Sequence, residues 1–298
     1  RVLLSKDKFP SEADARRALE LFETFGYGRA REIVPGILLT FVPAGHILGS
    51  AICVFDLLSS KQRVVFSGDL GRYNAPILRD PTAVESATTL IAESTYGDRA
   101  HKETHPMDLL AEIVNETAKR GGVVVIPAFA VGRTQEILYH LDNLERARRI
   151  PELPVFVDSP MACDATPIYL AHSSDHDLDM KKLVIDGKTP LQTRHTKFVV
   201  SANESKQLNH FKGPGIIISA SGMATGGRIL HHLKHRVSDP KNTIVFVGYQ
   251  SVGTRGRRML DGEPTIRLHG QEVPVRAQLT QISGFSAHVD WTEMLRWM

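Results

Sequence analysis

Three apolar runs of strand length end in glycine-rich turns, and each turn presents one side chain that can bind a metal ion. The first turn carries His46, the second carries Asp69, and the third, near the far end of the sequence, carries His288. Imidazole and carboxylate groups are ligands that zinc accepts, and small neighbours let a backbone approach a metal closely. Singly, each residue has an ordinary interpretation as a turn or surface residue. Their coincidence predicts a metal site at the strand ends.

Composition sets wide limits on the fold and on the partners. The 298 residues, 42% of them hydrophobic, allow two domain-sized units with a sizeable core. The net charge of +3 is small, so a polyanion must be met by a local cluster of cations. Cys53 and Cys163 lack zinc-finger spacing and predict free thiols in a reducing cytoplasm. No apolar run approaches membrane-spanning length, which predicts a soluble protein with no membrane contact.

The first third of the chain predicts one helix followed by a sheet. We expect an amphipathic helix over 11–25, capped by Ser11, and strands over 37–42, 51–57, 63–67 and 88–93. The last strand delivers Glu93 at its carboxyl end. An acid there either caps a turn or orients a metal-bound histidine or water, and the neighbouring ligand candidates favour the orienting role.

From residue 105 onward, helical and strand patterns alternate. This alternation predicts βαβ units and therefore a parallel sheet. The expected helices cover 107–119, 132–144, a short segment from 166, 229–237 and 290–298; the expected strands cover 123–126, 155–158, 197–200, 215–219 and 242–249, with a hairpin of 266–268 and 273–279 around His269 and Gly270.

Two segments have the composition of anion sites. The strand 215–219 runs into a Gly/Ser/Thr loop and then a helix, where exposed N–H groups and the helix dipole favour phosphate. The Gly-Lys-Ser/Thr ending of a nucleotide-triphosphate loop is missing, and a merely tight turn is the alternative. Residues 253–258 add an arginine cluster, for which solvent exposure is the alternative. The expected phosphate contacts are Ser221, Gly222, Thr225, Gly226, Gly227, Arg228, Arg255 and Arg258.

With these segments in view, the chain resembles the β-CASP branch of the metallo-β-lactamase fold. It is most similar to bacterial and archaeal relatives of the endonuclease that cuts eukaryotic pre-mRNA at its 3′ end. The motifs that carry the resemblance occur in the family's order at 44–50, 66–71, 93–98, 126–136, 158–161, 221–228 and 284–288. The resemblance implies an α/β protein, a metallo-β-lactamase αββα sandwich without its N-terminal part and with an inserted β-CASP domain of parallel-sheet type. The implied division is 1–97 and 257–298 for the first domain and 98–256 for the insertion.

The resemblance also implies a mechanism and its residues. In the family, two zinc ions share a bridging aspartate, and a hydroxide between them attacks the phosphodiester. Carried over, His46 and His288 resemble histidine ligands, Asp69 the bridging carboxylate, and Glu93 the acid that steadies the histidines. Asp69, Glu93 and His288 are therefore the expected catalytic residues. The motifs at 126–136 and 158–161 add Arg133 and Ser159 to the expected RNA contacts.

Two departures from the family pattern affect these expectations. The ligand motif His-x-His-x-Asp-His occurs nowhere in the 298 residues. We therefore expect a fragment or one half of a split enzyme, inactive by itself and active only with that segment. Where eukaryotic members place a catalytic histidine, residues 253–258 offer arginine, which leaves the general acid unassigned.

The resulting hypothesis is a zinc-dependent ribonuclease that hydrolyses single-stranded RNA in RNA processing or decay. Contacts to phosphate alone predict weak sequence preference and strong salt dependence. The alternatives are a non-catalytic RNA-binding or scaffold partner of such a nuclease and a small-molecule metallo-hydrolase. A homodimer is left open as a further partner state.

Overall fold

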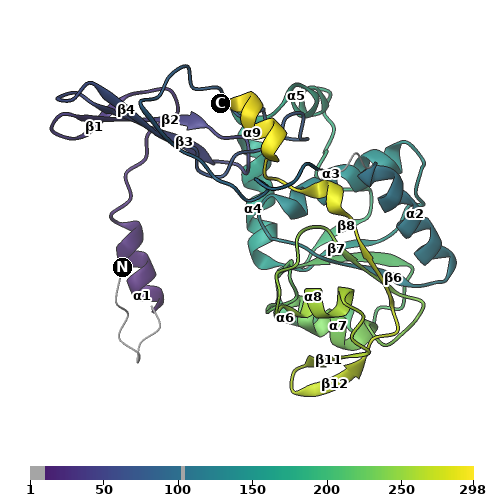
Figure 1. The fold of residues 1–298 in the computed structure, drawn as a ribbon. Helices are drawn as coiled ribbons and strands as arrows, with labels where there is room; N and C mark the ends of the chain where they lie inside the picture. Colours follow the sequence, from purple (N-terminus) through teal and green to yellow (C-terminus); the bar gives the residue numbers. More distant parts are fainter. Residues whose placement is uncertain (1–10, 102–104) are drawn as a thin grey trace.

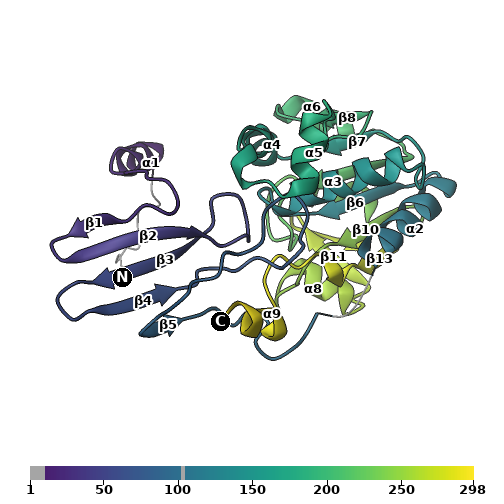
Figure 2. The same cartoon turned by 90° about the horizontal axis from the view of Figure 1, so that it is seen from above.

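Two β-sheets form the two halves of the molecule. The structure is a computed structural model that describes residues 11–101 and 105–298. Strands β1 to β5 lie at one end, and the parallel sheet with most of the helices lies at the other (Figures 1 and 2). The C-terminal helix α9 (Trp291–Trp297) returns to the side of the first sheet. None of the helices within the described residues is long and apolar enough to cross a membrane.

The first sheet has five strands in the order β1-β2-β3-β4-β5. Neighbours are antiparallel except β4 and β5, which are parallel. One face is packed by a small core of Ile52, Val54 and Val65, together with Val289 and Trp297 from the C-terminal segment. The strands are β1 (Arg31–Val34), β2 (Ile37–Pro43), β3 (Ala51–Leu57), β4 (Gln62–Phe66) and β5 (Thr89–Ile91). The expected strands of this region are confirmed to within two residues, whereas β1 was not predicted.

The expected N-terminal helix is shorter than its pattern indicated. Helix α1 covers Glu12–Leu19, and Ser11 caps it through a reciprocal pair of hydrogen bonds with Asp14. The prediction that the helix continues to residue 25 was wrong. None of the helix residues is buried, and Leu21 beyond it is 83% exposed. Because short helices depend on tertiary packing, a segment with no buried face is not extended past its strong cap.

The second sheet has six parallel strands in the order β13-β10-β6-β9-β7-β8. Alternate side chains of its central strands enter two different cores: Ile216 and Ile218 pack on one face, and Ile217 packs on the other. Continuous apolar strands are typical of parallel sheets covered on both faces. The strands are β6 (Val123–Pro127), β7 (Val155–Val157), β8 (Thr196–Phe198), β9 (Gly215–Ser219), β10 (Thr243–Phe246) and β13 (Gln278–Gln281).

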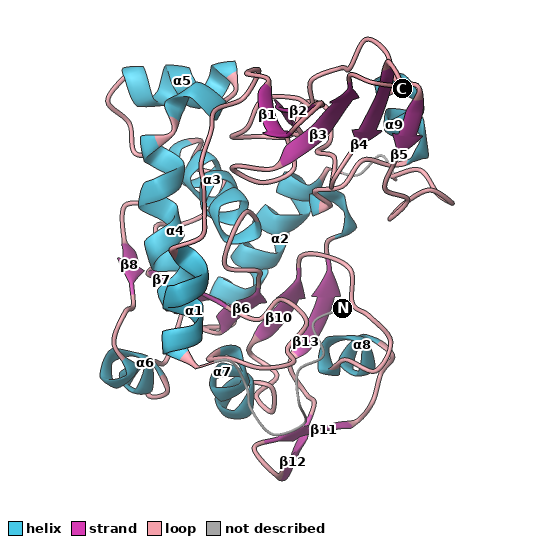
Figure 3. Cartoon of the chain, turned by 90° about the vertical axis from the view of Figure 1, so that its left-hand side faces the viewer, coloured by secondary structure: helices cyan, strands magenta, loops and turns pink. Residues whose placement is uncertain are grey.

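Helices cover both faces of this sheet. Figure 3 shows α2 and α3 on one side of β6, β10 and β13, and α7 and α8 on the other. The first side holds α2 (Pro106–Lys119), α3 (Arg133–Arg146) and α4 (Pro160–Ala171), and the second holds α7 (Ile229–Arg236) and α8 (Arg255–Leu260). Helix α4 begins before the expected residue 166 because Ser159 caps it and Pro160 occupies its first turn. The short helices α5 (Leu178–Ile185) and α6 (Ala202–Leu208) were not predicted.

The expected hairpin has a different second half. Strands β11 (Thr265–Leu268) and β12 (Gln271–Pro274) pair as a hairpin, and β13 then joins β10 of the parallel sheet. The expected strand 273–279 is interrupted because the N–H groups of Arg276 and Ala277 donate to the carbonyl of Val237 and not to a partner strand. The chain reaches the five-stranded sheet again after the turn η2 (Ser283–Phe285). The domain division at 97/98 and 256/257 stays a prediction.

Candidate metal centre

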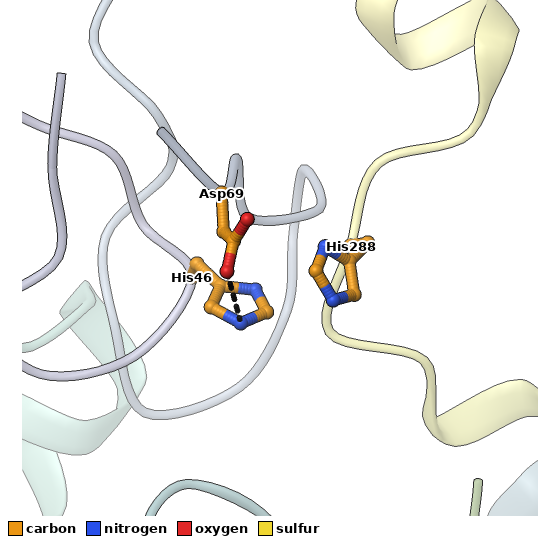
Figure 4. Close-up of side chains that lie close together, drawn as sticks. All are labelled: His46, Asp69 and His288. Atoms are coloured by element: carbon orange, nitrogen blue, oxygen red, sulfur yellow. Dashed lines mark ion pairs between the residues drawn. The ribbon is translucent and has the colours of Figure 1, made fainter. Parts of the chain in front are cut away.

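His46, Asp69 and His288 lie together although more than 240 residues separate the first from the last. One ligand atom from each lies within 4.8 Å of the other two. His46 Nε2 is 4.0 Å from Asp69 Oδ2, and the centroids of the two imidazole rings are 4.3 Å apart. Figure 4 shows the three side chains facing one another, with His288 arriving on the C-terminal segment. The convergence expected from the strand-end pattern is thus present in the fold.

Backbone contacts of Gly71 with the His46 and His288 loops hold the three loops together. The N–H of Gly71 donates to the carbonyl of Ala44 at 2.8 Å, and Gly71 forms an antiparallel bridge with His288. A Cβ at Gly71 would lie 2.0 Å from the carbonyl oxygen of Gly45, so a larger residue would push the His46 loop away. Gly45 itself has a φ of +70°, which favours glycine. The small residues therefore fix the distance between the ligand-bearing loops.

Glu93 orients the ring of His288. Its carboxylate oxygens lie 3.0 and 3.3 Å from His288 Nδ1, and Oε1 also accepts the N–H of Leu70 at 2.5 Å. The hydrogen bond that His288 Nδ1–H donates to the Glu93 carboxylate raises the pKa of His288. With Nδ1 held, Nε2 is the ring nitrogen available to the site. A carboxylate behind a histidine is the usual support of a metal-bound imidazole, which matches the orienting role expected for Glu93.

His46 is oriented by the backbone on the opposite side of the site. Its Nδ1 lies 3.2 Å from the carbonyl oxygen of Ala287, to which the Nδ1-protonated ring donates. This arrangement leaves Nε2 facing Asp69. Burial and the neighbouring His288 lower the pKa of His46, so the neutral ring that a metal requires is favoured.

The three side chains are a donor set for one divalent metal ion, with an open position. Two imidazoles and one carboxylate are a donor set that catalytic zinc sites use, and the fourth position is then free for water or substrate. Asp69, whose side chain is 62% exposed, lies on the open side. A second ion would need ligands in addition to these three.

A second group of potential ligands, His101, Asp290 and Glu293, is engaged in holding the fold. Asp290 caps α9 and accepts hydrogen bonds from the N–H groups of His101, Thr292 and Glu293. Burial alone would raise the pKa of Asp290, but these hydrogen bonds and that of the Thr292 hydroxyl lower it to about 2. The His101 ring lies 2.9 Å from the carbonyl oxygen of His288. This group therefore supports the segment that presents His288.

A cleft of about 750 Å³ opens beside the three side chains. Its walls come from the His46 and His288 loops and from the loops that follow β6, β9 and β10 of the parallel sheet. Ligand sites of open α/β sheets lie at these carboxyl ends of the strands. Sequence reasoning missed the aromatic lining residues Tyr96, Phe129 and Tyr249. The signal that could have found Phe129 and Tyr249 is an aromatic residue two or three positions after a buried strand.

Several residues expected to contact phosphate are bonded to other parts of the protein. Arg228 donates to Asp158 and to the carbonyls of Val199 and Val200. Arg258 pairs with Glu263.

Other predicted contacts support loops or line the cleft. Arg255 donates to backbone carbonyls of three residues, and Ser159 caps α4. Arg133 pairs with Glu136, and both line the cleft. Gly222 lines the cleft as well.

The Gly/Ser/Thr loop is organised by its own hydrogen bonds. Ser221 Oγ accepts the N–H groups of Thr225 and Gly226 at 3.1 and 3.3 Å. Gly227 has a φ of +80°, and a Cβ there would lie 2.5 Å from the carbonyl oxygen of Ala220. The tight-turn alternative thus describes much of this loop, and its phosphate role stays a prediction.

Comparison with known proteins identifies the family. Residues 134–259 match the Beta-Casp domain. The chain is 38% identical over 293 residues to "Ribonuclease TTHA0252" of Thermus thermophilus, covering 98% of this chain and 67% of that protein. It is 33% identical over 303 residues to an "RNase J-like protein" of Methanocaldococcus jannaschii, covering 100% of this chain and 69% of that protein.

The chain belongs to the β-CASP family of RNA nucleases, which have a metallo-β-lactamase fold. A further relative is the "Transcription termination factor FttA" of Methanosarcina mazei, 36% identical over 283 residues, which cover 91% of this chain and 44% of that protein. The fold class predicted from the sequence is confirmed. The matched β-CASP segment includes β7 to β10 of the parallel sheet, and the five-stranded sheet lies outside it.

Proposed function

We propose that this β-CASP protein is a zinc-dependent ribonuclease that hydrolyses phosphodiester bonds of single-stranded RNA. The observation that carries the proposal is the convergence of His46, Asp69 and His288 beside a cleft that the β-CASP loops complete. A non-catalytic RNA-binding partner would not require an oriented ligand set of this kind. The names of the ribonuclease relatives support hydrolysis of RNA over that of a small molecule.

The residues of the site have separate tasks in this proposal. When bound, zinc supplies an activated water and neutralises charge on the phosphodiester oxygens. His46 and His288 would hold the ion through Nε2, and Asp69 through a carboxylate oxygen. Glu93 keeps the His288 ring in place. Arg133 lies in the cleft wall close enough to His288 to influence it electrostatically, and we assign it to the RNA phosphate.

In this proposal Arg258 is not the proton donor for the leaving group. A hydrogen bond with Glu263 raises the pKa of Arg258, so its guanidinium keeps its proton. We assign this arginine to positioning of residues 255–263.

We further propose that full activity requires the His-x-His-x-Asp-His ligands, because the three side chains described here suffice for one zinc ion and the family uses two. The free thiols of Cys53 and Cys163 support a cytoplasmic setting. No observation on residues 11–101 and 105–298 supports a homodimer, and none is proposed.

The test is cleavage of a labelled single-stranded RNA of mixed sequence by the protein supplied with the His-x-His-x-Asp-His segment, with and without a chelator. We expect cleavage to stop after zinc removal and to return with added zinc. Metal analysis should then give one bound ion for the 298 residues and two when the His-x-His-x-Asp-His segment is supplied. Cleavage that persists unchanged without any divalent metal would contradict the proposal.

A further inference from the structure

Two aromatic rings remain exposed in the cleft beside the metal ligands. Phe129 is 52% exposed and Tyr249 is 54% exposed, although both follow fully buried strands. Both line the same cleft as His46 and His288. Exposed apolar side chains gathered along one cleft are typical of ligand-binding grooves.

The rings are held by neighbouring strands of one rigid sheet. Phe129 follows β6 and Tyr249 follows β10, and these strands are paired in parallel. Neighbouring strands lie about 4.8 Å apart, so the loops that carry the two rings emerge side by side. The structure therefore presents the two rings from adjacent positions along the cleft.

The loop after β9 supports this arrangement from behind. Gly222 packs so closely on Phe129 that a Cβ at position 222 would lie 3.2 Å from the phenyl ring. The side chain of Gln250 donates to the carbonyl of Gly222 at 3.1 Å, which ties the Tyr249 loop to the same support. Gln250 is buried. The positions of the two loops are thus fixed relative to each other before any ligand binds.

The chemistry of the cleft favours base contacts over phosphate contacts. Its walls include the apolar side chains of Val131, Met161, Met223 and Val247. The two arginines that line the cleft, Arg99 and Arg133, are each paired with a neighbouring acid, and Arg228 and Arg258 do not line it. A strand that enters this cleft meets aromatic faces and aliphatic groups more than free cations.

We propose that Phe129 and Tyr249 form a stacking platform for two bases of single-stranded RNA and thereby position the phosphodiester at the metal centre. Every base has a π-face, so stacking gives affinity without reading sequence. The inference rests on the proposed ribonuclease function, and it names the part of the RNA that the cleft holds. In this proposal, base stacking replaces phosphate contacts as the main source of affinity in the β-CASP half of the cleft.

The test compares RNA with and without bases. The probes are a fluorescein-labelled 12-mer of adenylate and an abasic ribose-phosphate 12-mer of equal length. Binding is measured in the full-length protein carrying Asp69→Ala, which prevents cleavage during titration. Into this background we introduce Phe129→Ala, Tyr249→Ala and Phe129→Trp. The matched control is Ile185→Ala, which removes an aliphatic side chain that is 83% exposed at the end of α5, outside the cleft.

We expect each alanine variant to weaken adenylate binding by roughly 5- to 100-fold, the range for loss of one base–aromatic stack. Binding of the abasic probe should stay within about twofold. Phe129→Trp should retain adenylate affinity, because an indole also stacks, and Ile185→Ala should change neither probe.

Equal losses on both probes, or no loss on adenylate, would overturn the stacking proposal. That result would arise if the rings served instead to pack another protein segment. The ribonuclease proposal has a separate readout, since the protein without Asp69→Ala must cleave the adenylate 12-mer. Cleavage combined with base-independent binding would support the ribonuclease proposal and contradict the stacking proposal.

Discussion

The two sheets differ in how they are buried and in what they contribute to the site. In the parallel sheet, β6, β9 and β10 are buried along their whole lengths between two layers of helices or loops. In the five-stranded sheet, β1 is exposed at every residue and β5 is largely exposed. Yet this less buried sheet carries His46, Asp69 and Glu93. These three site residues and most of the packing energy therefore lie in separate halves of the molecule.

Substitution of Asp69 should give the largest effect and should affect chemistry alone. In Asp69→Ala, kcat for RNA should fall by roughly 1,000-fold or more, as removal of a catalytic residue does elsewhere. Because this side chain is 62% exposed, the free energy of unfolding should change by less than about 0.5 kcal/mol. Cleavage kinetics measure the change in kcat, and urea unfolding of the same preparation measures the change in unfolding free energy. A variant that still cleaves at the original rate would remove the metal assignment.

Substitution of Asp158 should have the opposite result to substitution of Asp69, with a large effect on stability. Its buried carboxylate pairs with Arg228 and His232 and accepts the Ser205 hydroxyl at 2.6 Å. Asp158→Ala should lower the free energy of unfolding by about 3–5 kcal/mol, since it leaves buried partners unpaired. Chemical unfolding measures the change. The loss should be much smaller if the paired groups are reached by solvent.

The same residue predicts a dependence of stability on pH. Burial alone would raise the pKa of Asp158, but hydrogen bonds from His232, Ser205 and Arg228 lower it below the ordinary value of 3.8. A depressed carboxyl pKa gives stability that is present above the unfolded pKa and is lost as pH falls through the folded pKa. We therefore expect a loss below about pH 4 that is reduced in Asp158→Asn. If the unsubstituted protein and Asp158→Asn lost stability equally as pH falls, the assignment of the acid loss to Asp158 would be contradicted.

A pair of isoleucine substitutions compares the two sheets directly. Ile217 is fully buried in the parallel sheet, whereas Ile33 in β1 is 44% exposed. Ile217→Ala should cost about 2–5 kcal/mol of unfolding free energy, and Ile33→Ala less than about 0.5 kcal/mol. Thermal unfolding of both variants gives the ratio of the two losses in unfolding free energy. Equal losses would mean that β1 is covered in the functional protein.

Glu93→Gln should have the smallest of these effects, confined to the metal centre. The amide keeps the shape but loses the charge that supports His288. Zinc affinity should fall by about 10- to 100-fold, as for other outer partners of metal-bound histidines. Competition with a zinc-binding dye measures it. Unchanged affinity would reduce Glu93 to the capping role that its sequence context also allowed.

The sequence was sufficient for features that depend on local patterns. Short apolar runs located most strands of both sheets, although not β1, and the small residues around His46, Asp69 and His288 marked the turns that meet at the site. Helix α1 shows the limit of local pattern. Its cap was predicted correctly, but its end depends on packing that the sequence does not display.

Arginine partners could not be predicted in the same way. Residues 253–258 look like a free cationic cluster, but Glu263 and the carbonyls of Ala224 and Thr225 take up much of their donor capacity. These partners become neighbours only through tertiary structure. The exposed faces of Phe129 and Tyr249 were missed for the converse reason, because an aromatic residue after a buried strand is usually part of the core.

The short segment that carries His288 is anchored at both ends in different cores. Phe285 is buried among side chains of the parallel-sheet half, and Val289, directly after the ligand, is buried in the five-stranded half. If the halves hinge apart to admit a long polymer, this segment must stretch or turn, and the imidazole must leave its partners. Closure around the RNA and assembly of the complete ligand set would then occur together. The open form of the enzyme would therefore not hydrolyse RNA.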